Sequence, residues 1–105
     1  MTNGIFVGLS TIDVVYGVDE FPATNSKVVA LSQDVFVGGP ATHASITFGH
    51  LGGNTTLVTA VGCHALTNLI KEEIQRYSVR LIDMGPDFDK VPVISSISVN
   101  GIGVS

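Results

Sequence analysis

Residues 37–53 read VGGPATHASITFGHLGG, and this stretch decides the fold of the chain. The pair Gly38-Gly39 lets the backbone approach a ligand closely, and Pro40 suits the first turn of a helix because its missing N–H has no helical partner there. The second pair, Gly52-Gly53, ends the helix as a left-handed cap. The residues expected to face the core at helical spacing are Ala41, Ala44, Phe48 and Leu51.

Alternating strand and helix signals surround this helix. Residues 5–9 and 57–61 are short apolar runs typical of buried strands, the second closed by Gly62. Apolar residues over 66–77, ending at Tyr77, predict a second helix with Glu72 and Arg76 paired on its outer face. Residues 79–83 predict a third strand. This order predicts an α/β fold with a mostly parallel sheet.

Three further segments are predicted to be extended. Residues 14–16 follow the first strand, and after a loop at 21–25 the Val-rich segment 27–37 predicts one or two strands of an antiparallel flap. Residues 93–99 alternate in polarity, and Asn100-Gly101 is a hairpin signal.

Two features could bind a ligand. Asp13 is predicted to follow the first strand at its carboxyl end, where open α/β sheets bind ligands, and its carboxylate can accept strong hydrogen bonds from two neighbouring hydroxyls. A solvated loop carboxylate is the alternative. The N-terminus of the helix after Gly38-Gly39 would direct free N–H groups at hydroxyls, carboxylates or phosphates. A purely structural turn is the alternative there.

Composition excludes several classes of protein. Apolar residues make up 45% of the 105 residues and charged residues 13%, which favours a packed core over a disordered chain. The net charge is -4 and the basic residues are scattered, so we expect no nucleic-acid partner. The uncharged stretch 35–70 contains Pro40, glycine pairs and histidines, and buried core explains it better than a membrane span. The single Cys63 and the N-terminus without a signal peptide favour the cytoplasm.

The remaining reactive side chains do not form a recognisable site. The three histidines lack metal-ligand spacing, so we expect no metal site. Cys63 and His64 are adjacent, which disfavours a catalytic pair, and Cys63 is expected to be a buried small apolar residue. A solvated turn explains the acidic residues Asp83, Asp87 and Asp89.

Together these segments resemble the ribokinase-like, or pfkB, family of carbohydrate kinases. The residues that carry the resemblance are 8–13 (GLSTID), 21–22 (FP), 38–44 (GGPATHA), 51–53 (LGG) and 61–62 (VG). Their order and spacing agree with the N-terminal pattern of the family. The resemblance implies a Rossmann-like core and a small β lid that closes over the sugar, with lid strands within about residues 14–37 and 91–105. It covers the whole chain, 1–105, as the N-terminal part of one kinase domain.

The resemblance also implies which residues bind substrate. Asp13, with Thr11 two residues before it, would hold sugar hydroxyls; Gly38 and Gly39 would contact the sugar through their backbone, and His43 would add a side-chain hydrogen bond. The family usually has Asn at the positions of Thr11 and His43. It also usually has an Asp, followed three residues later by a Gly, where this chain has His64 and Thr67. These departures leave ribose specificity open.

The family's catalytic base is the Asp of a Gly-Ala-Gly-Asp motif, which is absent from this sequence. The resemblance therefore implies a kinase that uses ATP and Mg²⁺ to phosphorylate a sugar hydroxyl, of which this chain is the sugar-binding part, without a catalytic residue and inactive by itself. The alternative is a non-catalytic sugar-binding or dimerisation module. A homodimer through the lid strands is expected in either case.

Overall fold

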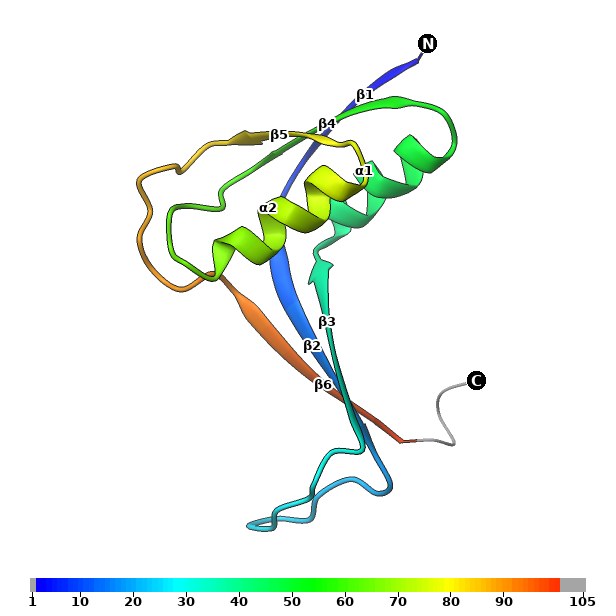
Figure 1. Cartoon of the computed structure of the whole chain (residues 1–105), viewed down its shortest axis with the longest axis vertical. Coiled ribbons are helices and arrows are strands. Elements are labelled where there is room, and N and C mark those ends of the chain that lie inside the picture. Colours follow the sequence, from blue (N-terminus) through cyan, green and yellow to red (C-terminus); the bar gives the residue numbers. More distant parts are fainter. Residues whose placement is uncertain (1, 101–105) are drawn as a thin grey trace.

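The computed structural model describes residues 2–100, and Figure 1 shows them as two parts that project in different directions. One part holds both helices and three strands, and the other is a ribbon of three strands with a loop at its far end. The elements in chain order are β1 (Asn3–Val7), β2 (Thr11–Val18), β3 (Ser32–Gly38), α1 (Pro40–His50), β4 (Asn54–Thr59), α2 (Thr67–Arg76), β5 (Arg80–Asp83) and β6 (Ile94–Asn100).

The first sheet has the strand order β1-β4-β5, and all its strands are parallel. Both helices pack on one of its faces, where Leu57 of β4 is buried with Ile70 and Ile74 of α2. The edge-to-face contact between Phe6 of β1 and Phe48 of α1, at 5.6 Å between ring centroids, joins the first helix to the same core. The predicted α/β class is confirmed.

Strand bounds differ from the prediction by a few residues. β4 begins directly after Gly53, three residues earlier than expected, because Asn54 pairs with Asn3 of β1 and its N–H donates to the carbonyl of Thr2. It ends at Thr59 rather than at residue 61. The start of β4 is therefore determined by its pairing with β1 and not by the start of its apolar run.

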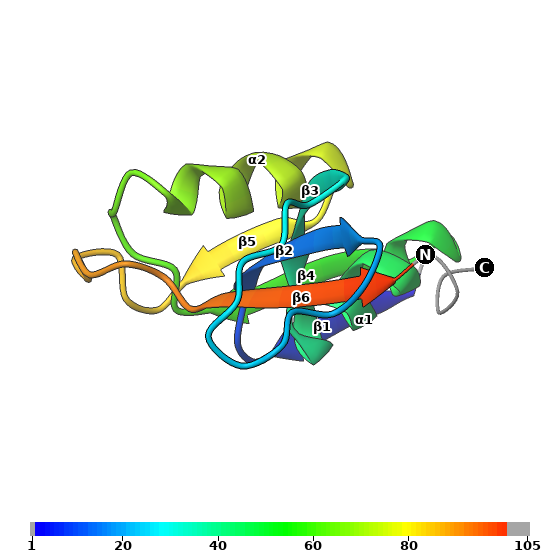
Figure 2. The same ribbon diagram turned by 90° about the horizontal axis from the view of Figure 1, so that it is seen from below.

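The second sheet has the order β3-β2-β6, with β2 antiparallel to β3 and parallel to β6. Figure 2 shows β2 and β6 running side by side in the same direction. All three segments predicted to be extended contribute to this one sheet. The prediction for 27–37 was wrong in its first part, because β3 begins only at Ser32, whose partner Gly17 is the last residue of β2 to pair with it. The predicted turn at Asn100-Gly101 lies partly outside the described residues.

The helix α1 begins and ends as predicted. Pro40 is in its first turn, and Gly52 follows its end with φ 93°. The N–H of Gly53 donates to the carbonyl of Phe48 at 3.0 Å, which completes a Schellman-type cap.

The prediction of which residues α1 buries was partly wrong. Its fully buried residues are Thr42 and Ser45, whereas Leu51 is 82% exposed. The hydroxyls of Thr42 and Ser10 lie 2.8 Å apart, and Ser45 donates to the carbonyl of Thr42 at 2.7 Å. Buried hydroxyls are tolerated when they are hydrogen-bonded, so small polar residues replace the expected apolar ones at this contact.

The face of the first sheet opposite the helices carries exposed apolar side chains. Ile5 and Val7 of β1 are 71% and 73% exposed, and Met84 after β5 is 69% exposed. Parallel sheets are normally covered on both faces. Within the described residues, both helices lie on the other face, so this face is an apolar surface open to solvent.

Candidate functional site

The residues predicted to bind substrate meet where the two sheets join. Asp13 follows β1 as predicted, but it lies within β2, which excludes the alternative of a solvated loop carboxylate. The turn after β1 is short, so β2 already begins at Thr11, and Asp13 is directly opposite Phe36 of β3. The Thr11 hydroxyl donates to Oδ1 of Asp13 at 2.8 Å, which orients the carboxylate.

Gly38 is needed here because its missing side chain leaves room for that carboxylate. It pairs with Thr11 across the strands. A Cβ at position 38 would lie 2.5 Å from both Cγ of Asp13 and Oγ1 of Thr11, and closer still to Oδ2 of Asp13. Such distances are not found for real Cβ atoms, so no larger residue fits without moving Asp13.

Gly39 has a different requirement, which concerns the backbone. Its φ is 104°, a region that residues with a side chain rarely adopt. A Cβ there would also collide with the backbone carbonyl of Leu9. Gly39 thereby turns the chain from β3 into α1.

His43 lies one turn into α1 and reaches back to β3. Its Nε2 is 3.2 Å from the carbonyl oxygen of Val37. A carbonyl only accepts, so Nε2 carries the proton in this contact. In the neutral ring Nδ1 is then an acceptor, and it can take a hydrogen bond from a hydroxyl. The side chain is exposed, so a ligand can reach it.

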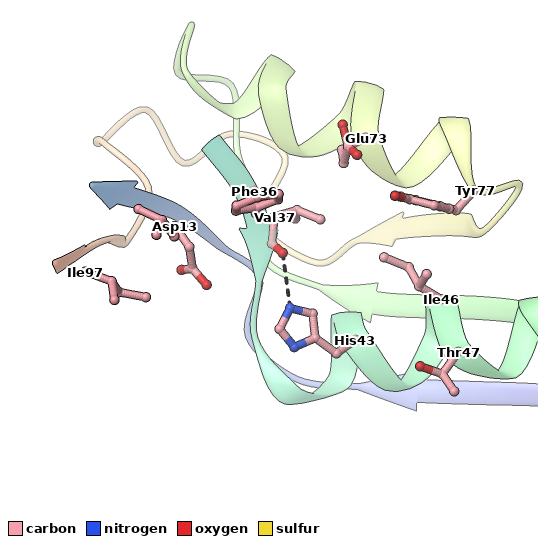
Figure 3. Close-up of a pocket in the computed structure, with 10 residues that line it drawn as sticks. Asp13, Phe36, Val37, His43, Ile46, Thr47, Glu73, Tyr77 and Ile97 are labelled. Atoms are coloured by element: carbon pink, nitrogen blue, oxygen red, sulfur yellow. Dashed lines mark hydrogen bonds between the residues drawn. The ribbon is translucent and has the colours of Figure 1, made fainter. Parts of the chain in front are cut away.

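A pocket of about 390 Å³ adjoins these residues, and Figure 3 shows the side chains around it. Asp13 and His43 line it, whereas Thr11, Gly38 and Gly39 lie beside it and shape it. The complete lining is Asp13, Val15, Phe36, Val37, His43, Ile46, Thr47, Glu73, Tyr77 and Ile97.

The pocket also contains residues that the sequence did not indicate as site residues. Glu73 lies in α2, and Tyr77 directly follows the last residue of this helix. The apolar spacing in the sequence assigned Tyr77 to the second helix but not to a binding site. Tyr77 is 39% exposed, and its ring meets that of His50 edge to face at 5.6 Å. Glu73, rather than Glu72, is the residue that pairs with Arg76, at 3.4 Å. No sequence signal shows that α2 lies beside β3.

Asp83 holds the loop after β4, and this corrects the expectation of a solvated turn. Its carboxylate accepts N–H groups from Val61 at 2.9 Å, from Gly62 at 3.0 Å and from Gly85 at 3.0 Å. Burial raises the pKa of Asp83, but these hydrogen bonds and the charge of Lys71 together lower it below the ordinary value of 3.8. The carboxylate is therefore a structural anchor between β4 and β5.

The other reactive side chains lie away from this pocket. Cys63 is exposed, so the expectation of a buried cysteine was wrong; the loop that Asp83 anchors carries it to the surface. His64 is a local cap, because its Nδ1 accepts the N–H of Leu66 at 3.0 Å before α2 begins. Among residues 2–100, no three His, Cys, Asp or Glu side chains gather closely enough to hold a metal ion. In the same range, no helix is both long and apolar enough to cross a membrane.

Known proteins resemble this chain in structure but not detectably in sequence. No protein-family model matches the chain, and no curated protein sequence matches it. Solved structures do match. Ribokinase from Thermotoga maritima is 25% identical with a TM-score of 0.76, and 97% of this chain aligns with 33% of that protein.

Two further structures agree with that match. A carbohydrate kinase from Agrobacterium tumefaciens is 16% identical with a TM-score of 0.80, over 98% of this chain and 33% of that one. A nucleoside kinase from Methanocaldococcus jannaschii, described as an archaeal member of the ribokinase family, is 20% identical with a TM-score of 0.76, over 98% of this chain and 34% of that one.

The chain thus spans about a third of the length of the kinases that it matches. The similarity covers both the helical part and the second sheet, since nearly all of the chain aligns. The resemblance found in the sequence is therefore confirmed in three dimensions: the chain has the fold of the ribokinase-like carbohydrate kinases over about a third of their length.

Proposed function

We propose that this chain is the sugar-binding part of a carbohydrate kinase that transfers the γ-phosphate of ATP to a hydroxyl of a sugar or sugar-like substrate. The observation that carries the proposal is the meeting of Asp13 and His43 at one pocket, where the Thr11 hydroxyl orients the Asp13 carboxylate and Gly38 leaves space for it. The likeness to ribokinase and to another carbohydrate kinase supports it.

The chemistry of these groups suits a polyol. A carboxylate offers about four acceptor positions, and the Thr11 hydroxyl occupies one of them on Oδ1. Adjacent sugar hydroxyls can donate to both carboxylate oxygens, and such charge-assisted bonds are about twice as strong as neutral ones. Nδ1 of His43 can accept a third hydroxyl. The chain's own residues thus bind and orient a sugar.

Phosphoryl transfer needs groups that these residues do not supply. The sequence has no Gly-Ala-Gly-Asp motif, and residues 2–100 hold no cluster suited to a metal ion. The residues present therefore do not fit ATP and Mg²⁺, and we assign both to other parts of the proposed kinase. The 105-residue chain is expected to bind sugar and to transfer no phosphate. The cytoplasm, which supplies ATP, is the compartment that we propose.

Calorimetric titration of the chain with a panel of pentoses, hexoses and nucleosides tests this proposal. At least one should bind, and Asp13→Asn should weaken its binding by about tenfold or more, since a charge-assisted hydrogen bond contributes about 1.5–3 kcal/mol. Asp34→Asn is the matched control, because Asp34 is an exposed aspartate on β3 that does not line this pocket. Equal loss in both variants, or no binding at all, would contradict the proposal.

The second sheet supports a further role as a lid and as a dimer interface. On the face of this sheet that does not carry Asp13, the apolar side chains Val35 and Ile94 are 50% and 42% exposed. Exposed apolar patches of this kind favour association. If the alternative function as a dimerisation module holds, Val35→Lys should convert a dimer to a monomer in sedimentation without changing sugar binding, because Val35 does not line the pocket.

A further inference from the structure

The two polar groups of the candidate site come from separate elements. Asp13 lies in β2 and His43 lies in α1, and both line the same pocket (Figure 3). Hydrogen bonds weaken steeply when their length or angle departs from the optimum. A ligand that bonds to both groups therefore binds well only when the start of β2 and the start of α1 are held at a fixed offset.

The turn between β1 and β2 packs directly on the start of α1. A Cβ on Gly8 would lie 2.7 Å from Cβ of Ala41, so a side chain at position 8 would not fit against the helix. The carbonyl of Leu9 lies against Gly39 in the same way, since a Cβ on Gly39 would collide with it. Steric contacts of this kind set how close the two segments come, and a directional bond fixes their offset.

A pair of buried hydroxyls supplies a directional bond between the turn and the helix. Oγ of Ser10 and Oγ1 of Thr42 lie 2.8 Å apart, and the two residues are 3% and 0% exposed. Oγ1 of Thr42 also donates to the carbonyl oxygen of Leu9 at the longer distance of 3.4 Å. Both hydroxyl protons are used when Ser10 donates to Thr42 and Thr42 donates to Leu9.

The two hydroxyls lie next to the site in the sequence without reaching the pocket. Ser10 directly precedes Thr11, whose hydroxyl orients the carboxylate of Asp13, and Thr42 directly precedes His43. Burial of hydroxyls costs free energy that an apolar pair would not lose. A buried polar pair whose bonds are satisfied favours one arrangement of the segments that it joins. The pair thus connects the two halves of the site.

We propose that Ser10 and Thr42 are positioning residues for sugar binding, and that the hydrogen bond between them fixes the spacing of Asp13 and His43. The inference rests on the proposed function, because it takes Asp13 and His43 as the groups that bind sugar. Neither positioning residue lines the pocket, so both act through their neighbours and do not touch the sugar. Without the bond, both sugar-binding side chains remain present but their spacing is no longer fixed.

Calorimetric titration and urea unfolding of the whole chain separate positioning from packing. The probe is the member of the sugar panel that binds the parent chain most tightly, with D-ribose, D-glucose and D-fructose included. The double variant Ser10→Ala, Thr42→Val removes both hydroxyls and leaves neither unpaired, so its stability should stay close to that of the parent chain. Its affinity should still fall about fivefold, the equivalent of one ordinary hydrogen bond. Parent affinity in this variant would overturn the inference.

Two single variants show whether the hydroxyl bond itself is responsible. Thr42→Ser keeps the hydroxyl and should keep the parent affinity, whereas a loss as large as in the double variant would assign the effect to the methyl group and overturn the inference. Thr67→Val is the matched control, because it removes an equally buried hydroxyl from α2, where Thr67 donates to the carbonyl of His64 at 2.6 Å. It should lower stability and leave affinity unchanged. An equal fall in affinity would show that lost stability alone explains the effect.

The failure of this inference differs from the failure of the proposed function. Parent affinity in the double variant, with sugar binding that still depends on Asp13, would refute only the positioning role of Ser10 and Thr42. Absence of sugar binding by the parent chain would refute both.

Discussion

Replacement of Gly38 by alanine adds one methyl group at the point where Asp13, Thr11 and β3 meet. The new Cβ would lie 2.5 Å from Cγ of Asp13 and from Oγ1 of Thr11, so the carboxylate must move or the strands must separate. Overpacking of this kind costs about 1–3 kcal/mol. The lower entropy of alanine in the unfolded chain offsets about 0.4–1 kcal/mol. We therefore expect a net loss of about 1–2 kcal/mol in the free energy of unfolding.

Sugar binding should fall with stability, since a displaced carboxylate loses charge-assisted hydrogen bonds of about 1.5–3 kcal/mol, or tenfold or more in affinity. Urea unfolding and calorimetric titration measure the two effects. Gly85→Ala is the control, because its Cβ would meet only ordinary contacts, the nearest at 3.6 Å from Cβ of Ala60. In the double variant with Asp13→Ala, part of the stability should return. Unchanged stability and affinity in Gly38→Ala would refute the steric role of Gly38.

Three more predictions concern Asp83, Gly39 and the exposed apolar face of the first sheet. Asp83→Asn should lower the free energy of unfolding by about 1–3 kcal/mol at pH 7, because the hydrogen bonds to Asp83 are weakened. The folded pKa of Asp83 lies below 3.8, so the difference from the parent chain should persist above about pH 5 and vanish as the pH falls through the folded pKa. Thermal melts across this pH range measure the difference. A pH-independent difference would argue against the charge. Gly39→Ala should cost about 1–3 kcal/mol of unfolding free energy, because its φ of 104° is strained for alanine; a neutral effect in urea would show that the turn can relax. The exposed apolar face should make the chain self-associate, and Val7→Lys should shift sedimentation toward monomer with little change in stability, whereas an already monomeric parent chain would contradict this.

Much of the fold could be predicted because its signals are local. Pro40 and Gly52 mark the ends of α1 through backbone chemistry that does not depend on the rest of the molecule. The start of β4 could not be found in this way, because pairing of Asn54 with Asn3 determines it. The burial of Thr42 was missed for a related reason, since its hydroxyl partner Ser10 is 32 residues away.

The candidate site was only partly accessible from the sequence. Spacing and resemblance indicated Asp13, Gly38 and His43, yet they did not show that Asp13 is a strand residue whose carboxylate occupies the space above Gly38. Glu73 and Tyr77 were missed because the packing of α2 beside β3 is a tertiary contact without a local signature.

The proposed function requires that a sugar binds where Asp13, Gly38 and His43 meet. The most direct measurement is the change in backbone amide signals of the ¹⁵N-labelled chain on titration with the tightest-binding sugar of the calorimetric panel. The largest changes should fall on residues 11–13 and 38–43, while residues 55–59 in the buried strand β4 stay unchanged. Changes confined to other residues, or none at saturating sugar, would contradict the claim.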